Sequence, residues 1–356
     1  MRVAAAMSGG VDSSVAAALA AAEGHEVIGL TLKLLPSGRW ETETGCCSAA
    51  AASDARAVAA HLGIKHYVLD AAEEFERDVV APFAAGYARG ETPNPCVWCN
   101  EKVKFGWFVR RAKEQGAEAL VTGHYARTGK RADGTPTLLR AVDETKDQSY
   151  FLYRLDAESL AYARFPIGAF RKTEVREKAR AMGLPVADKP DSQEICFVRE
   201  DTGHMPLILE RHPETVRAGE IVNAAGAVVG RHEGFAEFTV GQRRGLGVSA
   251  PERMYVLEVQ PQANRVVVGP ESSLGKRTLE IRDCRYPGGA APAEAFHAQV
   301  RIRSMHIPAA ARVFPLSGGT ARIEFESPQK GVAPGQSAVL YMDELVVGGG
   351  VIASSR

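Results

Sequence analysis

The sequence lacks several features that would place it in a specialised class of protein. No apolar run approaches the roughly 18 residues that a membrane-spanning helix requires, and the alanine-rich stretch at residues 16–22 is short and weakly hydrophobic. The N-terminus has no basic segment followed by an apolar core and a cleavage site, so we expect no secretion signal. These absences predict a cytoplasmic protein that has no contact with a membrane.

Cysteine is scarce, and neither sign of charge is in excess. Six cysteines in 356 residues are too few for a disulfide framework, so in a reducing compartment their spacing points to a metal site or to catalysis. The 43 basic and 43 acidic side chains cancel, which excludes a globally basic surface for nucleic acid but leaves room for local basic patches. Such patches occur at residues 171–180, at Arg243 and Arg244, and at Arg301 and Arg303; each taken singly is interpreted as solvated surface.

The order of hydrophobic patterns predicts an α/β protein with more than one domain. The first 125 residues alternate strand and helix patterns, typical of a doubly wound parallel sheet whose ligand lies beyond the carboxyl ends of the strands. From about Gly219 onward helical periodicity almost disappears, and short β-branched runs alternate with Gly and Pro turns. We therefore expect an α/β domain over residues 1–200, a small central β-rich domain over 201–270 and a C-terminal β-barrel over 271–356.

A glycine-rich loop follows the first expected strand. In residues 8–14, which read SGGVDSS, two adjacent glycines let several backbone N–H groups converge at the start of a helix, and this arrangement favours an anion such as phosphate. The loop has no lysine of the GxxxxGK[ST] type, so an ordinary P-loop kinase or NTPase is excluded. The string resembles the PP-loop ATP pyrophosphatases, which adenylate a substrate oxygen, and that resemblance leaves the attacking nucleophile open.

The cysteines bear on the nucleophile. Cys96 and Cys99 form a Cys-x-x-Cys pair, and Cys196 lies in DSQEICFV; zinc would require a second pair or histidines at matching spacing, so a reactive thiol is favoured. Cys99 is placed at the start of a helix expected over residues 100–115, where the helix dipole would favour a thiolate. The acidic neighbours of Cys196 give no such reason for that residue.

The motifs together resemble one family over essentially the whole chain. The strings SGGVDSS, TPNPCVWCN, TGHYA, KDQSYFLY, DSQEICFV, GQRRGLGV and PGQSAVLY are similar in order and spacing to those of the tRNA-specific 2-thiouridylases. The resemblance implies ATP-dependent replacement of the 2-oxygen of the wobble uridine by sulfur in tRNAs for Lys, Glu and Gln. It also implies Mg²⁺ accompanying ATP, an upstream persulfide donor protein, tRNA as partner and a monomeric chain.

The resemblance carries roles over to individual positions. The residues implied for ATP are Ala6, Met7, Ser8, Gly9, Gly10, Val11, Asp12, Ser13, Leu32 and Gly123. Cys196 would carry the persulfide and Cys99 would help to liberate its sulfur. The residues implied for the flipped base and for other tRNA contacts are Asn94, Pro95 and Cys96, then Lys146, Asp147 and Gln148, and in the barrel Arg303 and Ser304. No metal site is expected, apart from an alternative in which three cysteines hold an iron–sulfur cluster.

Three alternatives stay open. Many relatives have Asp where this chain has Cys96, so Cys96, Cys99 and Cys196 could together hold an iron–sulfur cluster, although we favour the persulfide route. The chain could instead be an amidating PP-loop ligase, or a tRNA-binding or redox protein without enzymatic activity. His124 ends an expected strand at the ligand edge, but a lone histidine there is interpreted as structural.

Overall fold

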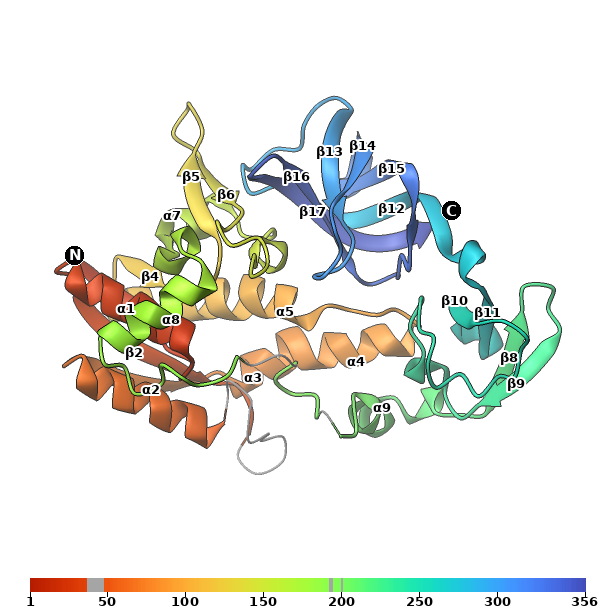
Figure 1. The fold of residues 1–356 in the computed structure, drawn as a ribbon, viewed down its shortest axis with the longest axis horizontal. Coiled ribbons are helices and arrows are strands. Elements are labelled where there is room, and N and C mark those ends of the chain that lie inside the picture. Colours follow the sequence, from red (N-terminus) through yellow and green to blue (C-terminus); the bar gives the residue numbers. More distant parts are fainter. Residues whose placement is uncertain (37–47, 192–194, 200) are drawn as a thin grey trace.

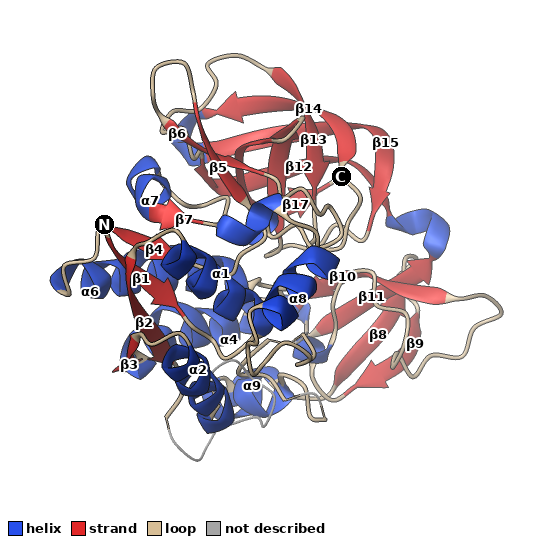
Figure 2. Ribbon diagram, turned by 60° about the vertical axis from the view of Figure 1, so that its left-hand side comes forward, coloured by secondary structure: helices blue, strands red, loops and turns tan. Residues whose placement is uncertain are grey.

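The computed structural model describes residues 1–36, 48–191, 195–199 and 201–356. Its N-terminal part is built on a five-stranded sheet in the order β3-β2-β1-β4-β7, with every neighbouring pair parallel (Figures 1 and 2). The strands are β1 (Arg2–Ala6), β2 (Glu26–Lys33), β3 (Lys65–Asp70), β4 (Ala119–Val121) and β7 (Ala163–Arg164). The alternation of strands and helices in the sequence therefore predicted the sheet correctly.

Helices cover both faces of this sheet because the strands are apolar on both sides. α1 (Val11–Ala22), α2 (Ala49–His61) and α8 (Lys172–Ala181) share one hydrophobic cluster with Val3 and Ala5 of β1. Ala4 of β1 points to the opposite cluster. That second cluster holds α3 (Ala72–Phe75), the π-helical segment Glu76–Val80, α4 (Ala81–Ala88), α5 (Pro95–Trp98), the π-helical segment Cys99–Trp107 and α6 (Phe108–Glu114); α7 (Ala157–Tyr162) lies against the same side.

The central part of the chain is a small β-rich module. A four-stranded sheet has the order β10-β11-β8-β9, in which only the β11–β8 pair is parallel. Its strands are β8 (Gly219–Asn223), β9 (Val228–His232), β10 (Met254–Gln260) and β11 (Arg265–Pro270), preceded by the short helix α9 (Met205–Arg211). Figure 1 shows this module beside the C-terminal part of α4.

The C-terminal part is a closed antiparallel barrel of six strands. The strands are β12 (Gly275–Arg285), β13 (Phe296–Arg301), β14 (Ala309–Leu316), β15 (Thr320–Lys330), β16 (Ser337–Met342) and β17 (Leu345–Ser355), and pairing of β12 with β17 closes the ring. The hairpin of β5 (Arg127–Lys130) and β6 (Pro136–Leu139) comes from the N-terminal part of the chain, but Leu139 pairs with Leu345 and extends the barrel sheet. The predicted fold class is confirmed.

Two expected elements have different bounds. The strand that was expected to end at His124 ends at Val121. The helix expected from residue 100 begins five residues earlier, at Pro95, because the side chain of Asn94 caps it by accepting a hydrogen bond from the Cys96 N–H at 3.2 Å. Residues 95–114 then form one continuous helical run, which we call the cysteine helix.

Thr92 connects the three modules just before the cysteine helix. Its N–H donates to the carbonyl of Pro334 at 2.7 Å, and its carbonyl accepts from the Gln336 side chain at 2.7 Å; both partners belong to the barrel. Its hydroxyl donates a hydrogen bond to that of Thr239 in the central module at 3.2 Å.

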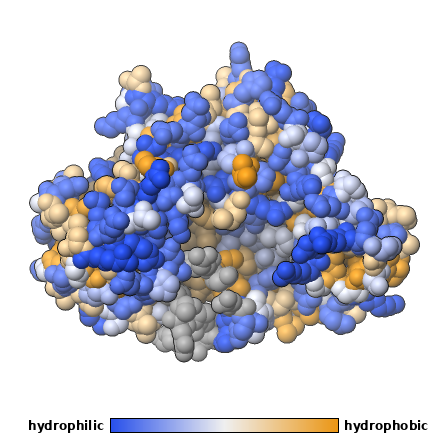
Figure 3. Space-filling model, viewed as in Figure 1, coloured by the Kyte–Doolittle hydropathy of each residue, from blue (hydrophilic) through white to orange (hydrophobic). Residues whose placement is uncertain are grey.

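The face of the molecule seen in Figure 1 is mostly hydrophilic, with small, scattered apolar patches (Figure 3). Among the described helices, none is both long and apolar enough to cross a bilayer.

Candidate nucleotide and thiol site

The loop between β1 and α1 is shaped by close backbone packing. Gly9 has φ +69°, and a Cβ at this position would stand 2.1 Å from the carbonyl oxygen of Ala51 in α2, so only glycine fits. The Ser8 N–H donates to the Ser13 hydroxyl at 3.2 Å, and Lys189 donates to the Gly9 carbonyl at 3.0 Å. The loop is therefore held open at the positive end of α1, a geometry that suits a phosphate group. We call residues 7–13 the phosphate loop.

Gly123 fixes the other wall of this loop. A Cβ on Gly123 would lie 2.4 Å from the Ser13 nitrogen and 2.6 Å from the Asp12 carbonyl carbon, so β4 and α1 approach backbone to backbone. Leu32 stands near the end of β2, opposite Leu69 of β3, and is half-buried. The residues that the resemblance implied for ATP thus gather at the carboxyl edge of the parallel sheet, where an α/β fold binds its ligand.

Asp12 of the phosphate loop is held by two groups from distant parts of the chain. The Lys172 ammonium donates to both carboxylate oxygens at 2.8 Å, and the Tyr125 hydroxyl donates to one of them at 2.9 Å. Burial, followed by the nearby Asp12 carboxylate, raises the pKa of Tyr125, so its hydroxyl remains a proton donor. Asp12 is therefore oriented as a hydrogen-bond acceptor at the phosphate loop.

Asp191 forms ion pairs with three cationic side chains beside Asp12. Its carboxylate accepts from Lys172 at 2.8 Å, from Lys146 at 3.0 Å and from Arg176 at 2.9 Å. Burial opposes ionisation of Asp191, but the hydrogen bonds from Lys172 and Lys146 outweigh it and lower the pKa of this carboxyl. The interpretation of residues 171–180 as solvated surface is thus wrong for Lys172, which is 9% exposed and serves the phosphate loop.

His124 links the phosphate loop to the cysteine helix. It follows Gly123 directly, its Nδ1 lies 2.8 Å from the Thr122 hydroxyl, and its ring centroid lies 6.0 Å from that of Phe105 in the cysteine helix. Burial, aided by Lys104, holds the pKa of His124 well below its ordinary value. The imidazole is therefore neutral at pH 7 and packs between the two parts of the site.

The cysteine helix brings Cys99 and Cys196 into one hydrophobic cluster. Cys99 is buried, and Cys196 is a partly exposed member packed against the same group of side chains. The neighbour of Cys196, Phe197, stacks edge-on with Phe75 and Phe83 at 5.6 and 5.1 Å, which anchors this part of the segment. Because the helix begins at Pro95, Cys99 lies a full turn inside it, and the expectation that Cys99 meets the free N–H groups of a helix start is wrong.

The described residues contain no group of three or more Cys, His, Asp or Glu side chains placed to hold a metal ion. Cys96, Cys99 and Cys196 are all described and do not form such a group, so the geometry gives the iron–sulfur alternative no preformed site. Cys284 is buried in the barrel core, and burial raises the pKa of its thiol to about 11, as suits an unreactive packing residue. Cys46 and Cys47, like Ser192 to Glu194, lie outside the described residues.

The positions implied for tRNA contact differ in their burial and in their hydrogen-bond partners. Asp147 is buried, and it accepts from the Ala141 and Ser149 N–H groups and from Arg301 of the barrel at 3.3 Å. Gln148 exchanges hydrogen bonds with the Tyr125 backbone. Arg303 is half-buried and donates to the Gly331 carbonyl at 2.9 Å, beside Gly241 of the GQRRG segment. Two basic points that are far apart in sequence, residues 241–244 and Arg303, therefore lie side by side.

Lys172, Lys189, Tyr125 and Asp191 are site residues that the sequence reasoning missed. Each bonds the phosphate loop or Asp12 directly, or stands one contact away. Lys172 in α8 and Lys189 and Asp191 in the segment after it share one sequence signal, a cluster of basic residues next to Asp188 and Asp191. Tyr125 instead follows β4, in the TGHYA string. A parallel sheet with this loop at its first strand-to-helix turn defines a PP-loop nucleotide-binding domain, here joined to two β modules.

Comparison with known proteins identifies the family. Residues 1–200 match the tRNA methyl transferase HUP domain, residues 208–270 the tRNA methyl transferase PRC-barrel domain, and residues 276–352 the aminomethyltransferase beta-barrel domain. A protein of Methylorubrum extorquens named tRNA-specific 2-thiouridylase MnmA is 47% identical over 359 residues, covering 99% of this chain and 93% of that protein. A protein of Moorella thermoacetica with the same name is 46% identical and covers 98% of both chains. The chain belongs to the tRNA-specific 2-thiouridylase family.

Proposed function

We propose that this chain is an enzyme that uses ATP to replace the 2-oxygen of the wobble uridine of tRNAs for Lys, Glu and Gln with sulfur. Family membership over nearly the full length supports the activity. The observation that carries the proposal is the contact path from Ser13 through Gly123 and His124 to Phe105, because it joins a phosphate loop to a cysteine-bearing helix within one site. Neither part alone would distinguish a thiolating enzyme from other PP-loop proteins.

The first step is activation of the base. The uridine O2 attacks the α-phosphate of ATP, pyrophosphate leaves, and the resulting AMP ester turns that oxygen into a leaving group. The phosphate loop and the N-terminus of α1 would hold the phosphates, with Lys172 and Lys189 supplying fixed positive charge nearby. We assign ATP contact to residues 6–13, Leu32 and Gly123. Mg²⁺ bound with ATP would neutralise phosphate charge, and Asp12 is the carboxylate of the phosphate loop that would hold it.

The second step is sulfur transfer. In our proposal the terminal sulfur of a Cys196 persulfide attacks C2 of the base and displaces AMP, leaving a Cys196–S–S–C2 linkage. The Cys99 thiolate then attacks the Cys196 sulfur, so the S–S bond to the transferred sulfur breaks, a Cys99–Cys196 disulfide forms, and 2-thiouridine leaves. An external thiol reductant and a persulfide donor protein restore the pair. The similarity of the two cysteine-bearing strings, TPNPCVWCN and DSQEICFV, to those of the family supports this pairing.

Substrate contacts follow from the same assignment. The target base leaves its stack and enters beside Asn94, Pro95 and Cys96 at the start of the cysteine helix, where Asn94 and Cys96 are half-buried and Pro95 is buried. We assign further tRNA contact to Lys146, Gln148, Arg303 and Ser304, and to Asp147 a supporting role only, since its carboxylate is buried against Arg301. We propose that the enzyme acts as a cytoplasmic monomer. The modules are proposed to span residues 1–200, 201–270 and 271–356.

A combined assay tests the function. Pyrophosphate exchange and AMP release are measured with and without tRNA, and transfer of labelled sulfur is measured in the same preparation. A thiolating enzyme shows tRNA-dependent AMP release that matches sulfur incorporation. An amidating ligase would keep its activity in Cys99→Ser, and a tRNA-binding or redox protein would show no exchange at all.

Cysteine variants separate the sulfur routes. We expect Cys196→Ser to lose the labelled protein adduct, Cys99→Ser to keep the adduct without completing thiolation, and Cys96→Ser to be mildly impaired. Iron is measured in anaerobic preparations of the same proteins. A stoichiometric cluster together with an inactive Cys96→Ser would overturn the persulfide route, whereas iron-free wild type with full activity supports it.

A further inference from the structure

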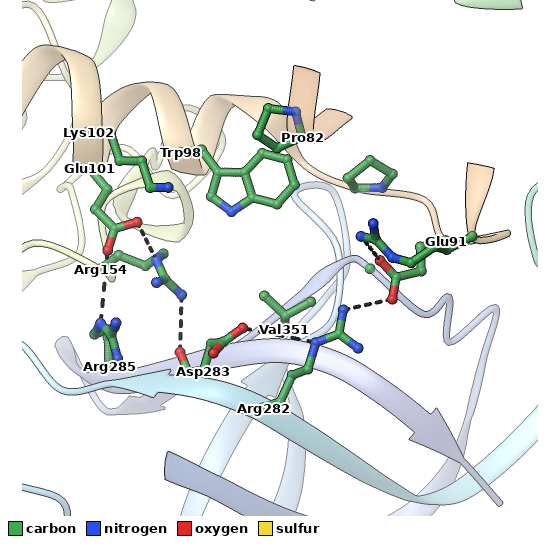
Figure 4. Close-up of a pocket in the computed structure, with 13 residues that line it drawn as sticks. Pro82, Glu91, Trp98, Glu101, Lys102, Arg154, Arg282, Asp283, Arg285 and Val351 are labelled. Atoms are coloured by element: carbon green, nitrogen blue, oxygen red, sulfur yellow. Dashed lines mark hydrogen bonds and ion pairs between the residues drawn. The ribbon is translucent and has the colours of Figure 1, made fainter. Parts of the chain in front are cut away.

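A cavity of about 400 Å³ lies between the cysteine helix and the barrel, and no residue of the phosphate loop lines it (Figure 4). Trp98 and Lys102 reach into it from the cysteine helix, and Pro82 closes the same wall. Arg282 and Arg285 reach into it from strand β12 of the barrel. The activity described above does not use this cavity.

The lining of the cavity carries a net positive charge. Its five basic side chains outnumber its three acidic ones; they are Arg89, Lys102, Arg154, Arg282 and Arg285 against Glu91, Glu101 and Asp283. Two of the acids lie deep, with the side chains of Glu91 and Glu101 only 14% and 20% exposed, whereas those of Arg282 and Arg285 are 40% and 53% exposed. The solvent-facing part of the cavity is therefore predominantly cationic, and it favours an anionic ligand.

Ion pairs hold these cations in place before any ligand binds. Arg282 donates to Glu91 at 2.7 Å, and the same carboxylate accepts from Arg89 at 2.9 Å. Arg154 donates to Glu101 at 2.7 Å and to the Asp283 carbonyl at 3.1 Å. Arg282 and Arg154 are therefore already oriented beside the more exposed Arg285 and Lys102, which reduces the side-chain entropy lost when an anion binds.

The cavity also offers an aromatic surface next to these cations. The indole of Trp98 is partly exposed and faces the cavity beside the apolar rings of Pro82 and Pro93. An aromatic face beside arginine and lysine side chains is the combination that proteins use to bind single-stranded nucleic acid, with the base stacked and the phosphate paired. The size and lining together therefore suit one nucleotide.

We propose that this cavity binds a nucleotide that neighbours the target uridine in the same RNA strand, with its base on Trp98 and its phosphate at Arg285 and Lys102. The inference rests on the proposed function. Pro93 lines the cavity and directly precedes Asn94 and Pro95, which are assigned to the target base. A strand whose target base lies at Asn94 thus carries its next nucleotide to the wall of this cavity.

The test uses the full chain with saturating ATP, so that the phosphate loop is filled, and two probes: an anticodon stem-loop RNA of a substrate tRNA and free UMP. The variants are Trp98→Ala, Trp98→Phe, Lys102→Glu and Arg285→Glu, with Lys276→Glu, at the far end of β12, as the matched control. We expect Trp98→Ala to weaken the stem-loop affinity about 5- to 100-fold, the range of one lost base stack, and Trp98→Phe to retain most of it. Lys102→Glu and Arg285→Glu should weaken it and flatten its salt dependence, while Lys276→Glu does neither.

Each outcome decides the matter. Stem-loop affinities unchanged in folded variants, with thermal unfolding like wild type, would overturn the proposal and leave the cavity as a structural ion-pair junction. Loss of UMP binding with unchanged stem-loop affinity would make it a site for free nucleotides and overturn the RNA assignment. A wild type without tRNA-dependent AMP release would refute the proposed function instead, and that result is independent of the binding data.

Discussion

The Lys172 ammonium lies 2.8 Å from both carboxylate oxygens of Asp12, although 160 positions separate the two residues. The pair joins helix α8 to the phosphate loop, and Lys172 also bonds Asp191. The direction of the Asp12 carboxylate is thereby fixed. Lys172 is consequently a positioning residue for the nucleotide loop.

Replacement of Lys172 by Met should leave the Asp12 carboxylate without the group that positions it. We expect Lys172→Met to reduce the rate of AMP formation about 100-fold, because displacing a reacting group by about 1 Å can lower a rate by that factor. The affinity for tRNA should stay close to that of the wild type. Stability should fall by about 1–3 kcal/mol, since Asp12 loses a charged hydrogen-bond partner. Lys178→Met on the same helix is the matched control. Equal loss of tRNA binding in a folded Lys172→Met protein would contradict this role.

Gly123→Ala tests the close approach of β4 and α1. The new Cβ would stand 2.4 Å from the Ser13 nitrogen, so strand and helix must separate and the phosphate loop must shift. We expect ATP affinity to fall at least about tenfold, measured by calorimetry, because the N–H groups at the start of α1 lose their common direction. Gly275→Ala in the barrel, whose tightest contact would be 3.1 Å to a side chain, should bind ATP as wild type does.

RNA binding should depend on salt despite zero net charge. Arg243 and Arg244 are exposed, and the backbone of their segment touches Arg303 of the barrel. We expect the tRNA affinity to fall steeply as salt rises, and Arg243→Ala to reduce the slope of log K against log salt by about one. Arg111→Ala on α6 is the control. A flat response in wild type would mean that these arginines are only solvated surface.

Asp147 should behave as a structural residue rather than as a direct tRNA contact. Its side chain is 3% exposed and pairs with Arg301, so removal leaves a buried cation without its partner. We expect Asp147→Ala to lower the free energy of unfolding by about 3–5 kcal/mol. Denaturant unfolding measures this, and Lys146→Ala, which breaks a half-exposed pair with Asp191, is the comparison. A stable Asp147→Ala protein with weakened tRNA binding would support direct contact instead.

His124 predicts a stability that declines in mild acid. Burial lowers its pKa in the folded state, so as pH falls through about 6.5 the unfolded chain takes up a proton that the folded chain refuses. The contribution of neutral His124 to the free energy of unfolding is fully present above that pH. Below it, about 1.4 kcal/mol is lost for each pH unit of acidification until the folded-state pKa is reached. Asp191, whose pKa is lowered, loses its contribution only below about pH 4.

Thermal unfolding of wild type and His124→Asn between pH 8 and pH 5 measures this effect. The two proteins should differ by a constant amount above pH 7.5, and the gap should then narrow as the wild type loses stability. Parallel profiles over the whole range would show that His124 does not titrate in this way.

Local signals in the sequence predicted the fold well. The glycine pair stands between β1 and α1 as expected, and Ser48, a residue type favoured at helix starts, caps α2 through a hydrogen bond from the Ala51 N–H. These features depend on residues a few positions apart, so periodicity and capping rules reach them. The Asn94-Pro95 pair is also a helix-start signal, and it would have placed Cys99 inside the helix rather than at its beginning.

Long-range pairs were beyond the reach of such rules. Nothing in the neighbourhood of Lys172 says that it is buried against Asp12, because that contact arises only when α8 packs on α1. Asp147 lies in a polar segment that looks exposed, and its burial comes from the barrel strand that carries Arg301. Tertiary packing decides both cases, and charge patterns along the chain do not encode it.

The hydrogen bonds of Thr92 have a consequence for how the chain can be divided. The segment that introduces the cysteine helix takes its backbone partners from the barrel and a side-chain partner from the central module. An isolated N-terminal module would keep the phosphate loop but lose the acceptor and donor that fix the Thr92 peptide groups. Such a fragment should still bind ATP, but the start of its cysteine helix would no longer be held in position. ATP binding can therefore be retained without the two β modules, whereas sulfur transfer requires the whole chain.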